Sequence, residues 1–389
     1  TDKFITRFAK VYTPIVVIAA VLLCVVPSLI FGDFTSWLQK ALVLLVASCP
    51  CALVISIPLG FFAASGAASK NGILIKGGRF VEALAQARAV VFDKTGTLTT
   101  GRLSVGRISA AEGFSEGDVL EYAAVADKYS SHPAAKAIIS KYELTCGELP
   151  EGEDYKETPG HGAEAVFCGK HILCGSAKWM QKNGCDVSGL PADSVYVAAD
   201  GIVIGSLQIS DTVRPESAKA IKELKDFGIK HTAMLSGDSA ASCAAVAGEC
   251  GLDEYAASLL PEQKVERLNK IKADYGTTIF VGDGINDAPV LAAADAGAAM
   301  GLGSDAALES ADVVLVSDSP AQLPQALKIC KRAMGVIRFN IVFALTVKAL
   351  VFLLVPFGLA NMWMAVAADV GVSVLSVLNA TRILRFGKR

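Results

Sequence analysis

The sequence predicts a multi-domain membrane protein with four transmembrane helices, a doubly wound parallel α/β sheet and an inserted α+β domain. Three observations predict this fold class. The hydrophobic fraction of 52% and the mean hydropathy of +0.46 are too high for an ordinary soluble protein. Four apolar runs are long enough to cross a bilayer. Between the second and third runs, apolar β-type stretches alternate with helical stretches.

The four predicted membrane helices cover about 14–32, 38–62, 341–360 and 361–380. Basic residues flank one end of each pair, whereas the short connections near Asp33 and Asn361 carry almost none. By the positive-inside rule we expect both termini and the long middle region to be cytosolic, in a multi-pass protein of the cell membrane.

The domain boundaries follow from these runs. We expect membrane helices with the Cys-Pro-Cys stretch in 1–62, the parallel sheet in 63–104 and 211–335, the inserted domain in 105–210, and the last two membrane helices with the tail in 336–389. Within the inserted domain we expect a helix over about Glu121 to Lys141. Short strands should follow, with turns at Gly169-Lys170 and Asp200-Gly201.

Charge and cysteine content exclude some classes of function. A formal net charge of -2 argues against nucleic acid as a partner, because a phosphate-binding face needs a basic excess. Ten cysteines lack the dense, paired spacing of a secreted disulfide scaffold, which indicates a reducing compartment for most of them. The chain starts at Thr1 without a signal peptide, so we expect a fragment or a processed piece.

Acidic residues follow several of the predicted strands. In VVFDKTGTLT, Asp93 lies at the carboxyl end of a strand, where open α/β sheets bind ligands. A carboxylate there can attack phosphorus if a cation neutralises the phosphate. Asp283 and Asp287 in GDGIND could hold Mg²⁺, while Lys264 in PEQK offers a charge and Ser236 in LSGD a hydroxyl. Any one of them alone would be read as a loop or turn residue, but together they favour phosphoryl chemistry.

DKTGTLT, GDGINDAP, PEQK and SGD, in this order, resemble the phosphorylation domain of P-type ATPases, which share the haloacid dehalogenase fold. The resemblance implies ATP and Mg²⁺ as cofactors, and Asp93 and Asp283 as ligands of the Mg²⁺. Related phosphatases carry a second aspartate where this chain has Thr95, which cannot act as an acid or base at neutral pH. We therefore expect a lasting aspartyl phosphate. The implied catalytic set is Asp93, Lys264, Thr95, Ser236 and Asp287.

DKYSSHPAAKAI places His132 at the start of a helix that Ser130 or Ser131 could cap. The stretch resembles the Ser-x-His-Pro signature in the nucleotide-binding domain of heavy-metal P-type ATPases. Alone, His132 would be read as a helix-end histidine; with the glycines of TPGHGAEA, adenine contact is favoured. In this chain Asp127 stands where the family usually has glutamate. The implied adenine-binding set is Asp127, His132, Gly160 and Gly162.

A second cysteine pattern, CGKHILC, presents Cys168, His171 and Cys174 and invites a zinc interpretation. No fourth ligand is near in the sequence, and Gly169-Lys170 is typical of a hairpin turn. We interpret the three as strand residues.

VASCPCALVIS breaks an apolar run with a proline between Cys49 and Cys51. Freed backbone groups are tolerated in a membrane where they line a cavity, and thiolates select Cu(I), Zn(II) and Cd(II). Lys348 and Asp369 lie near the middle of apolar spans, where an ionisable residue is costly. Two thiolates, one carboxylate, one ammonium and a divalent ion sum to zero charge. We therefore expect zinc, cadmium or lead rather than Cu(I).

This combination resembles the zinc/cadmium/lead-exporting subgroup of heavy-metal P-type ATPases, over the whole chain. The resemblance implies that Cys49, Cys51 and Asp369 bind the transported ion and that Lys348 pairs with Asp369. We add the hypothesis that Lys348 competes with the metal for Asp369 and helps to expel it. Members of the subgroup also have earlier membrane helices and an actuator domain with a Thr-Gly-Glu loop, neither of which is in this sequence. We expect those parts of the same protein, membrane lipid and the metal ion as partners, and no complete cycle from this piece alone.

Three alternatives stay open: a membrane-anchored phosphatase of the haloacid dehalogenase type, a Cu(I)-exporting ATPase, and a non-catalytic metal-binding remnant. Thr95 and the pair Lys348 and Asp369 argue against the phosphatase. Retention of every phosphoryl motif argues against the remnant.

Overall fold

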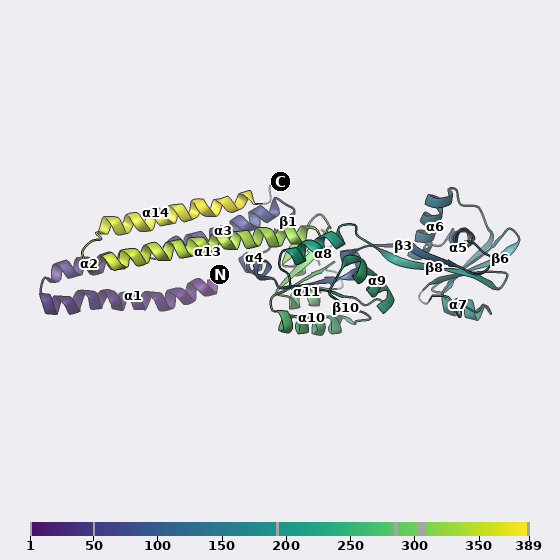
Figure 1. Ribbon diagram of the computed structural model, residues 1–389, viewed down its shortest axis with the longest axis horizontal. Coiled ribbons are helices and arrows are strands. Elements are labelled where there is room, and N and C mark those ends of the chain that lie inside the picture. The colour runs from purple at the N-terminus through teal and green to yellow at the C-terminus, as the bar shows by residue number, and fades with distance from the viewer. Residues whose placement is uncertain (1, 50, 192–193, 284–286, 302–308, 387–389) are drawn as a thin grey trace. The chain divides into compact units, whose positions relative to one another are not determined.

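A computed structural model describes residues 2–49, 51–191, 194–283, 287–301 and 309–386. The chain divides into two compact units. Unit 1 comprises residues 1–97 and 215–389 and contains the long apolar helices and a mainly parallel sheet. Unit 2 comprises residues 98–214 and is built on an antiparallel sheet, whereas the sequence had suggested an insertion over 105–210. Figure 1 shows the elements of both units.

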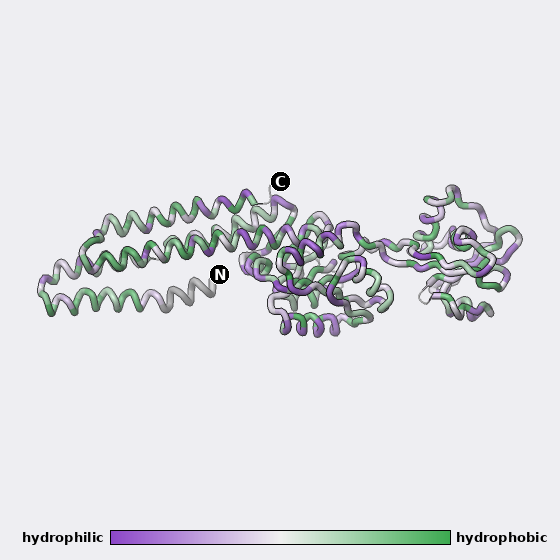
Figure 2. The backbone as a smooth tube through the Cα atoms, in the orientation of Figure 1, coloured by the Kyte–Doolittle hydropathy of each residue, from purple (hydrophilic) through white to green (hydrophobic). Residues whose placement is uncertain are grey.

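Unit 1 contains four segments that are long and apolar enough to cross a membrane, among the described residues: 12–31, 34–69, 322–354 and 362–385. They include α1 (Asp2–Phe31), α2 (Phe34–Ala47), α3 (Cys51–Ser69), α13 (Gln322–Leu354) and α14 (Met362–Thr381). Many of their exposed side chains are large and hydrophobic. Figure 2 colours most of the residues in these segments as hydrophobic. The predicted span 38–62 is two helices, α2 and α3. The predicted span 341–360 overlaps the second half of the longer α13, which ends at Leu354 before a turn through Gly358.

The first half of α13 belongs to the α/β part of unit 1. Its side chains at Leu323, Ala326 and Leu327 are fully buried. The Gln322 side chain donates to the carbonyl oxygens of Asn71 and Gly72, each at 3.0 Å. In the second half, buried Asn340 donates to the carbonyl oxygen of Ser376 on α14 at 2.9 Å. One helix is therefore held by polar contacts at both the sheet and the bundle.

The sheet of unit 1 has the strand order β1-β13-β12-β11-β2-β9-β10. All described neighbours are parallel except β1 and β13, so the predicted doubly wound parallel sheet is confirmed, with an antiparallel edge. The central strands are buried on both faces, as parallel sheets covered by helices are. The strands are β1 (Ile73–Ile75), β2 (Ala89–Asp93), β9 (His231–Leu235), β10 (Glu254–Ala256), β11 (Thr278–Gly282), β12 (Ala296–Met300) and β13 (Val313–Leu315).

Helices pack on this sheet and fix its loops. From α10 and α11, the side chains of Leu268, Ile271 and Leu291 share a core with Val91 and Phe280 of the strands. Because β11, β2 and β9 are neighbours, the loops that follow them meet at one edge of the sheet. The helices are α4 (Gly78–Gln86), α8 (Ser217–Asp226), α9 (Ala240–Cys250), α10 (Pro261–Tyr275) and α11 (Ala288–Ala293), with short turns η1 (Lys94–Leu98) and η2 (Arg382–Arg385).

Unit 2 is a six-stranded antiparallel sheet in the order β3-β8-β7-β6-β5-β4. Alternate side chains point to opposite faces: Ile172 and Cys174 pack with α5 and α6, while Leu173 packs with Trp179 of α7. The predicted α+β character of this region is thereby confirmed. Its elements are β3 (Thr99–Ala110), α5 (Glu116–Asp127), α6 (Pro133–Cys146), β4 (Glu153–Thr158), β5 (Gly162–Phe167), β6 (Lys170–Gly175), α7 (Ala177–Lys182), β7 (Val195–Ala199) and β8 (Ile202–Val213).

The prediction of one helix over Glu121 to Lys141 is wrong, because α5 ends at Asp127 and α6 begins at Pro133. Neither Ser130 nor Ser131 is the N-cap of α6. The cap is His132, whose Nδ1 accepts a hydrogen bond from the backbone N–H of Ala134 at 3.2 Å.

The hairpin turn between β5 and β6 lies one residue earlier than predicted. Cys168 and Gly169 have φ values of 55° and 76°, as a two-residue turn of this kind requires. Cys168 is therefore a turn residue, not the strand residue we expected, while His171 and Cys174 do lie in β6. Asp200 and Gly201, with φ values of 50° and 80°, form the second predicted turn.

The close approach of β5 and β6 gives a test of this packing. A Cβ atom added at Gly162 would lie 2.3 Å from the carbonyl oxygen of Cys174. We expect Gly162→Ala to lower the free energy of unfolding of unit 2 by about 1–3 kcal/mol, the range for overpacking. Hydrogen exchange of the β5 and β6 amides would measure the change.

The matched control is Gly248→Ala in α9, where an added Cβ meets nothing within 4 Å. Its amides should be unchanged or slightly more protected, because alanine is the better helix former. Unchanged protection of β5 and β6 in Gly162→Ala would contradict the described register.

Candidate phosphoryl-transfer, nucleotide and metal sites

Three predicted charged residues meet at the carboxyl edge of the sheet in unit 1. Asp93 ends β2 and is 6% exposed, Lys264 lies in the first turn of α10, and Asp287 precedes α11. Lys264 Nζ lies 2.6 Å from Asp93 Oδ1 and 2.9 Å from Asp287 Oδ1. One ammonium therefore bridges two carboxylates that come from separate parts of the sequence.

Burial dominates the electrostatics of this cluster. It raises the pKa of Asp93 to about 7; the charge on Asp287 adds to the rise and Lys264 opposes it. Burial also raises the pKa of Asp287. For Lys264, burial works against the charged form, but the two carboxylates outweigh it and raise the pKa. The cluster thus holds more negative charge than one ammonium neutralises.

The turn after Asp93 brings a further carboxylate to this edge. Thr95 (φ -76°, ψ 130°) and Gly96 (φ 73°, ψ -8°) have the angles of a type II turn, which needs glycine at the second position. A Cβ at Gly96 would lie 3.6 Å from the Cβ of Asp283, so Asp283 lies beside this turn. Thr95 itself is exposed. Residues 284–286 of the GDGIND stretch lie outside the described residues.

The loop after β9 lies next to the same turn. Buried Ser236 follows Leu235, which pairs with Asp93 in the sheet. The hydroxyl of Ser236 accepts a hydrogen bond from the N–H of Asp238 at 3.1 Å. The side chain of Lys94 pairs with Asp238 and so links the two loops. The structure brings together Asp93, Ser236, Lys264, Asp283 and Asp287.

This donor set fits Mg²⁺. The charges of Asp287 and Asp283 both raise the pKa of Asp93, which places three carboxylates close enough to repel one another. Carboxylate oxygens with excess negative charge are what Mg²⁺ prefers.

The membrane bundle of unit 1 gathers the second predicted set. One sulfur from Cys49, one from Cys51 and a carboxylate oxygen of Asp369 all lie within 4.8 Å of one another. Cys49 follows the end of α2, Cys51 begins α3 and Asp369 is in the middle of α14. Pro50 lies outside the described residues. The predicted ligands can therefore reach a single ion.

Lys348 of α13 lies against this set. Its Nζ is 3.1 Å from Asp369 Oδ1 and also donates to the carbonyl oxygen of Cys49. That carbonyl lies at the break between α2 and α3, where it has lost its partner within a helix. The ammonium therefore satisfies the hydrogen-bonding need of this backbone group.

The structure also joins Cys49 to Cys51 by a disulfide, which the sequence analysis did not anticipate. The other described cysteines are free. Metal ligation needs thiolates, so these two sulfurs must be reduced before they can bind an ion.

Unit 2 contains a cavity of about 250 Å³ between α5, α6 and the β5–β6 hairpin. Asp127, His132, Gly160 and Gly162, the predicted adenine-binding set, all line it. Sequence reasoning missed Glu157, His161 and Cys174, which line it too. His161 stands between the two glycines, and this position in TPGHGAEA was the one available signal for it.

Two side chains in this cavity have distinctive chemistry. Asp127 is 7% exposed, and Cys174 Sγ donates to its Oδ2 at 3.4 Å. Burial raises the pKa of Asp127 to about 7, against the opposing hydrogen bond from Cys174. His132 uses Nδ1 for its helix cap, and within the described residues Nε2 has no partner. The cavity thus presents a titratable carboxyl and an imidazole nitrogen to a ligand. Cys174 is not a zinc ligand here but the partner of Asp127.

The chain is similar to known proteins over almost its whole length. Residues 87–295 match the family model of haloacid dehalogenase-like hydrolases. A cadmium, zinc and cobalt-transporting ATPase of Bacillus subtilis (strain 168) is 47% identical over 99% of this chain and 56% of its own. The chain therefore spans little more than half the length of this curated relative.

Solved structures give the same picture. A crystal structure of a zinc-transporting PIB-type ATPase in the E2·Pi state superposes with a TM-score of 0.87 at 38% identity, over 98% of this chain and 64% of that one. A catalytic domain of the CPx-ATPase CopB-B, studied for its response to nucleotide binding, has a TM-score of 0.53 at 32% identity. It covers 67% of this chain and 97% of its own.

The raised pKa of Asp127 predicts a pH-dependent stability. Below about pH 4 this carboxyl is protonated in the folded and unfolded chain and costs nothing. Between about pH 4 and 7 only the unfolded chain releases the proton, so the free energy of unfolding falls, by up to ~4 kcal/mol in total, and stays low above pH 7. Asp127→Asn cannot ionise. We expect it to unfold at higher denaturant concentration than wild type at pH 8 and at the same concentration at pH 4.

Exposed Glu143 on α6 provides the control. Glu143→Gln removes one carboxylate from unit 2 without relieving burial, and its stability should follow wild type at both pH values. If Asp127→Asn behaves like this control, the carboxyl of Asp127 is not desolvated as described.

Proposed function

We propose that the whole protein exports a soft divalent metal ion and uses ATP to do so. The premise is that this chain belongs to the haloacid dehalogenase-like hydrolases and, among them, to the heavy-metal P-type ATPases. The chain is a multi-pass membrane protein. The transported ion is Zn²⁺, Cd²⁺ or Pb²⁺, and the covalent intermediate is an aspartyl phosphate. The observation that carries the proposal is the meeting of Cys49, Cys51 and Asp369 within 4.8 Å, in a chain that also pairs Lys264 with Asp93.

In the phosphoryl-transfer step, an oxygen of Asp93 forms a bond to the terminal phosphorus of ATP. The bond from that phosphorus to the bridging oxygen breaks, and ADP leaves. The pKa of about 7 means that Asp93 needs neighbouring positive charge to stay ionised. Lys264 supplies part of it and is positioned to stabilise the oxygens of the transferred group.

When bound by Asp93 and Asp283, Mg²⁺ supplies further neutralisation of the phosphate oxygens. Asp287 holds the ammonium of Lys264 by a second ion pair, and Ser236 offers a hydroxyl to a phosphate oxygen. Thr95 has no group that could act as a base at neutral pH, so hydrolysis of the aspartyl phosphate needs a group from elsewhere. This argues against the membrane-anchored phosphatase.

The cavity of unit 2 would receive the adenine. His132 offers Nε2 and Asp127 its carboxyl group, and Gly160 lines the cavity without a side chain. The similar catalytic domain of a CPx-ATPase is described as changing conformation upon nucleotide binding, which supports a nucleotide site in this part of the chain.

The membrane set suits a divalent soft ion. Two thiolates and one carboxylate carry three negative charges, and Lys348 with a divalent ion carries three positive ones, so the site is neutral when loaded. Cu(I) would leave it negative. Because Lys348 already contacts Asp369 at 3.1 Å, it competes with the metal for that carboxylate and favours release.

Acylphosphate formation tests the phosphoryl site. With the whole protein, labelled ATP, Mg²⁺ and zinc, we expect an acid-stable, hydroxylamine-sensitive phosphoprotein that is absent in Asp93→Asn. Lys264→Ala should form it at least roughly ten-fold more slowly, because the transferred group loses its charge partner. Exposed Lys270→Ala on the same helix is the control and should keep the wild-type rate. Labelling of Asp93→Asn at wild-type level would refute the assignment.

Metal-stimulated ATP hydrolysis tests the membrane site under reducing conditions. Zn²⁺, Cd²⁺ and Pb²⁺ should stimulate the whole protein and Cu(I) should not, with stimulation lost in Cys51→Ser and Asp369→Asn. Cys24→Ser, a cysteine of α1 outside the set, should be stimulated normally. Stimulation by Cu(I) alone would overturn the choice of ion.

The release role of Lys348 needs its own measurement. Lys348→Ala should bind metal at least as tightly as wild type and release it more slowly, because Asp369 has lost its competing cation. Release followed with a metal-sensitive dye after a single turnover would show this. Normal release by Lys348→Ala would remove the competition hypothesis and leave the ligand set untouched.

A further inference from the structure

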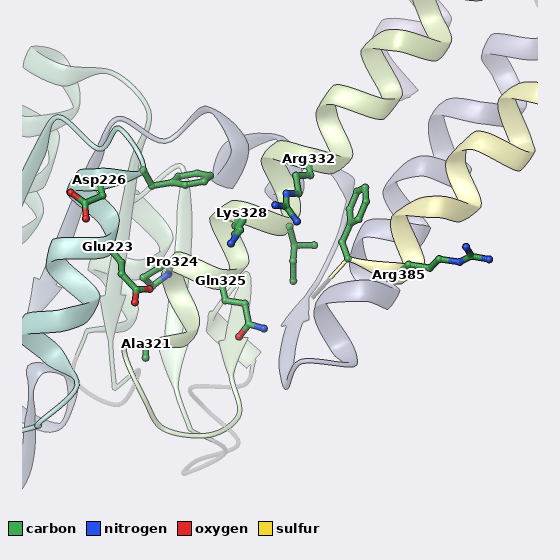
Figure 3. A pocket seen from close by; sticks show the side chains of 11 residues that line it. Glu223, Asp226, Ala321, Pro324, Gln325, Lys328, Arg332 and Arg385 are labelled. Carbon is green, nitrogen blue, oxygen red and sulfur yellow. The ribbon is translucent and has the colours of Figure 1, made fainter. Parts of the chain in front are cut away.

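A cavity of about 680 Å³ in unit 1 has no part in the proposed function. Its walls come from α8, from the first half of α13 and from the residues that follow α14 (Figure 3). Glu223 and Asp226 lie on the α8 side, and Lys328 and Arg332 lie on α13. The cavity is far larger than one water molecule needs, so it can hold a ligand.

The cations of this cavity lack partners. Lys328 and Arg332 are one helical turn apart, are exposed, and make no ion pair or hydrogen bond within the described part of the chain. The same holds for Arg385, whose side chain extends away from α8 in Figure 3. Like charges four residues apart on a helix repel each other. An anion between them would remove this cost.

The cavity lies close to the cytosolic end of the membrane bundle. On α13, Arg338 is the last charged residue before the apolar run that leads to Lys348. Arg332 precedes it by six residues, or about 9 Å along the helix axis. Arg385 ends the fourth candidate span. The headgroup layer is about 5–8 Å thick on each side of the hydrocarbon, so long basic side chains here can reach it.

The remaining residues that line the cavity restrict the chemical class of the ligand. Phe386 and Ile329 add apolar surface beside the cations. On the α8 wall, Glu223 Oε1 lies 3.9 Å from Lys219 Nζ. The carboxylates of Glu223 and Asp226 would repel a second phosphate, but they can accept hydrogen bonds from hydroxyl groups. These features fit one phosphodiester, next to a hydroxyl-bearing headgroup on one side and to hydrocarbon on the other.

We propose that this cavity binds the headgroup of an anionic phospholipid of the phosphatidylglycerol type from the cytosolic leaflet. Lys328 and Arg332 contact the phosphate oxygens, Arg385 attracts the lipid at the membrane edge, and Glu223 and Asp226 accept hydrogen bonds from the glycerol hydroxyls. The site is separate from the metal and nucleotide sites, and the inference does not depend on which ion is transported.

Retention of lipid by the whole protein tests the inference. The protein would be equilibrated with vesicles of phosphatidylglycerol in phosphatidylcholine, extracted in mild detergent, and its bound lipid identified by native mass spectrometry. We expect selective retention of phosphatidylglycerol by wild type. Lys328→Gln/Arg332→Gln should weaken it by about five-fold for each cation removed. The variant Lys328→Arg/Arg332→Lys keeps both positive charges and should retain phosphatidylglycerol as wild type does.

The control variant Lys230→Gln/Lys270→Gln removes two exposed cations from outside the cavity and should retain the lipid as wild type does. Equal loss in this control, or no preference over phosphatidylcholine in wild type, would overturn the proposal in favour of general surface charge. Displacement of the lipid by inorganic phosphate at low concentration would overturn it in favour of a soluble anion.

A second variant keeps the test sharp if the double glutamine variant fails to fold. Glu223→Ala/Asp226→Ala leaves the phosphate contacts in place and removes the acceptors for the glycerol hydroxyls. We expect it to lose the preference for phosphatidylglycerol over phosphatidic acid while it still retains both. An unchanged preference would show that the headgroup does not lie against α8.

Discussion

One unbroken helix, α13, is the constraint on which the rest of unit 1 depends. At its start, the Gln322 side chain donates hydrogen bonds to the turn between α3 and β1, and the neighbouring side chains are buried. Further along, Lys348 reaches Asp369 and the carbonyl of Cys49. The two positions are 26 residues apart, or about 39 Å of rigid helix. The rigid helix α13 therefore connects the surroundings of Lys348 to the α/β part of unit 1, whose sheet carries Asp93.

The phosphoryl-transfer site and the membrane site share one electrostatic feature. In each site an ammonium is buried against carboxylates: Lys264 against Asp93 and Asp287, and Lys348 against Asp369. A buried carboxylate without a cation is costly, and so is a buried ammonium without an anion. At each site one ammonium therefore offsets part of the negative charge before a ligand arrives, and a cationic ligand must displace or share that ammonium.

Much of this arrangement could be predicted from the sequence. Asp93, Lys264 and Asp287 follow strands or open a helix within short motifs, and the order of strands in a doubly wound sheet brings such loops together. Cys49, Cys51, Lys348 and Asp369 stand out because polar groups are rare in apolar runs. The single helix expected over Glu121 to Lys141 disregarded a local signal, because SSHP itself indicates a helix start, and α6 does begin at Pro133. Nothing in the spacing shows that His132 rather than a serine caps α6.

Some contacts between residues distant in sequence could not be predicted. Cys174 looked like a possible metal ligand, but the pairing of β6 with its neighbours sets it against Asp127 instead. Burial of the first half of α13 in the α/β part of unit 1 could not be predicted either, because its basic residues are typical of the segment that precedes a membrane helix. The disulfide of Cys49 and Cys51 depends on the state of the sulfurs, which residue order does not encode.

The cap at the start of α6 determines which tautomer the nucleotide cavity presents. Because Nδ1 of His132 accepts the N–H of Ala134, the neutral ring must carry its proton on Nε2. Nε2 of the neutral ring is therefore a hydrogen-bond donor on the wall of this cavity. In the proposed role of His132, a donor suits a ring nitrogen of a purine and not an exocyclic amino group, so a single backbone contact at a helix terminus sets this preference.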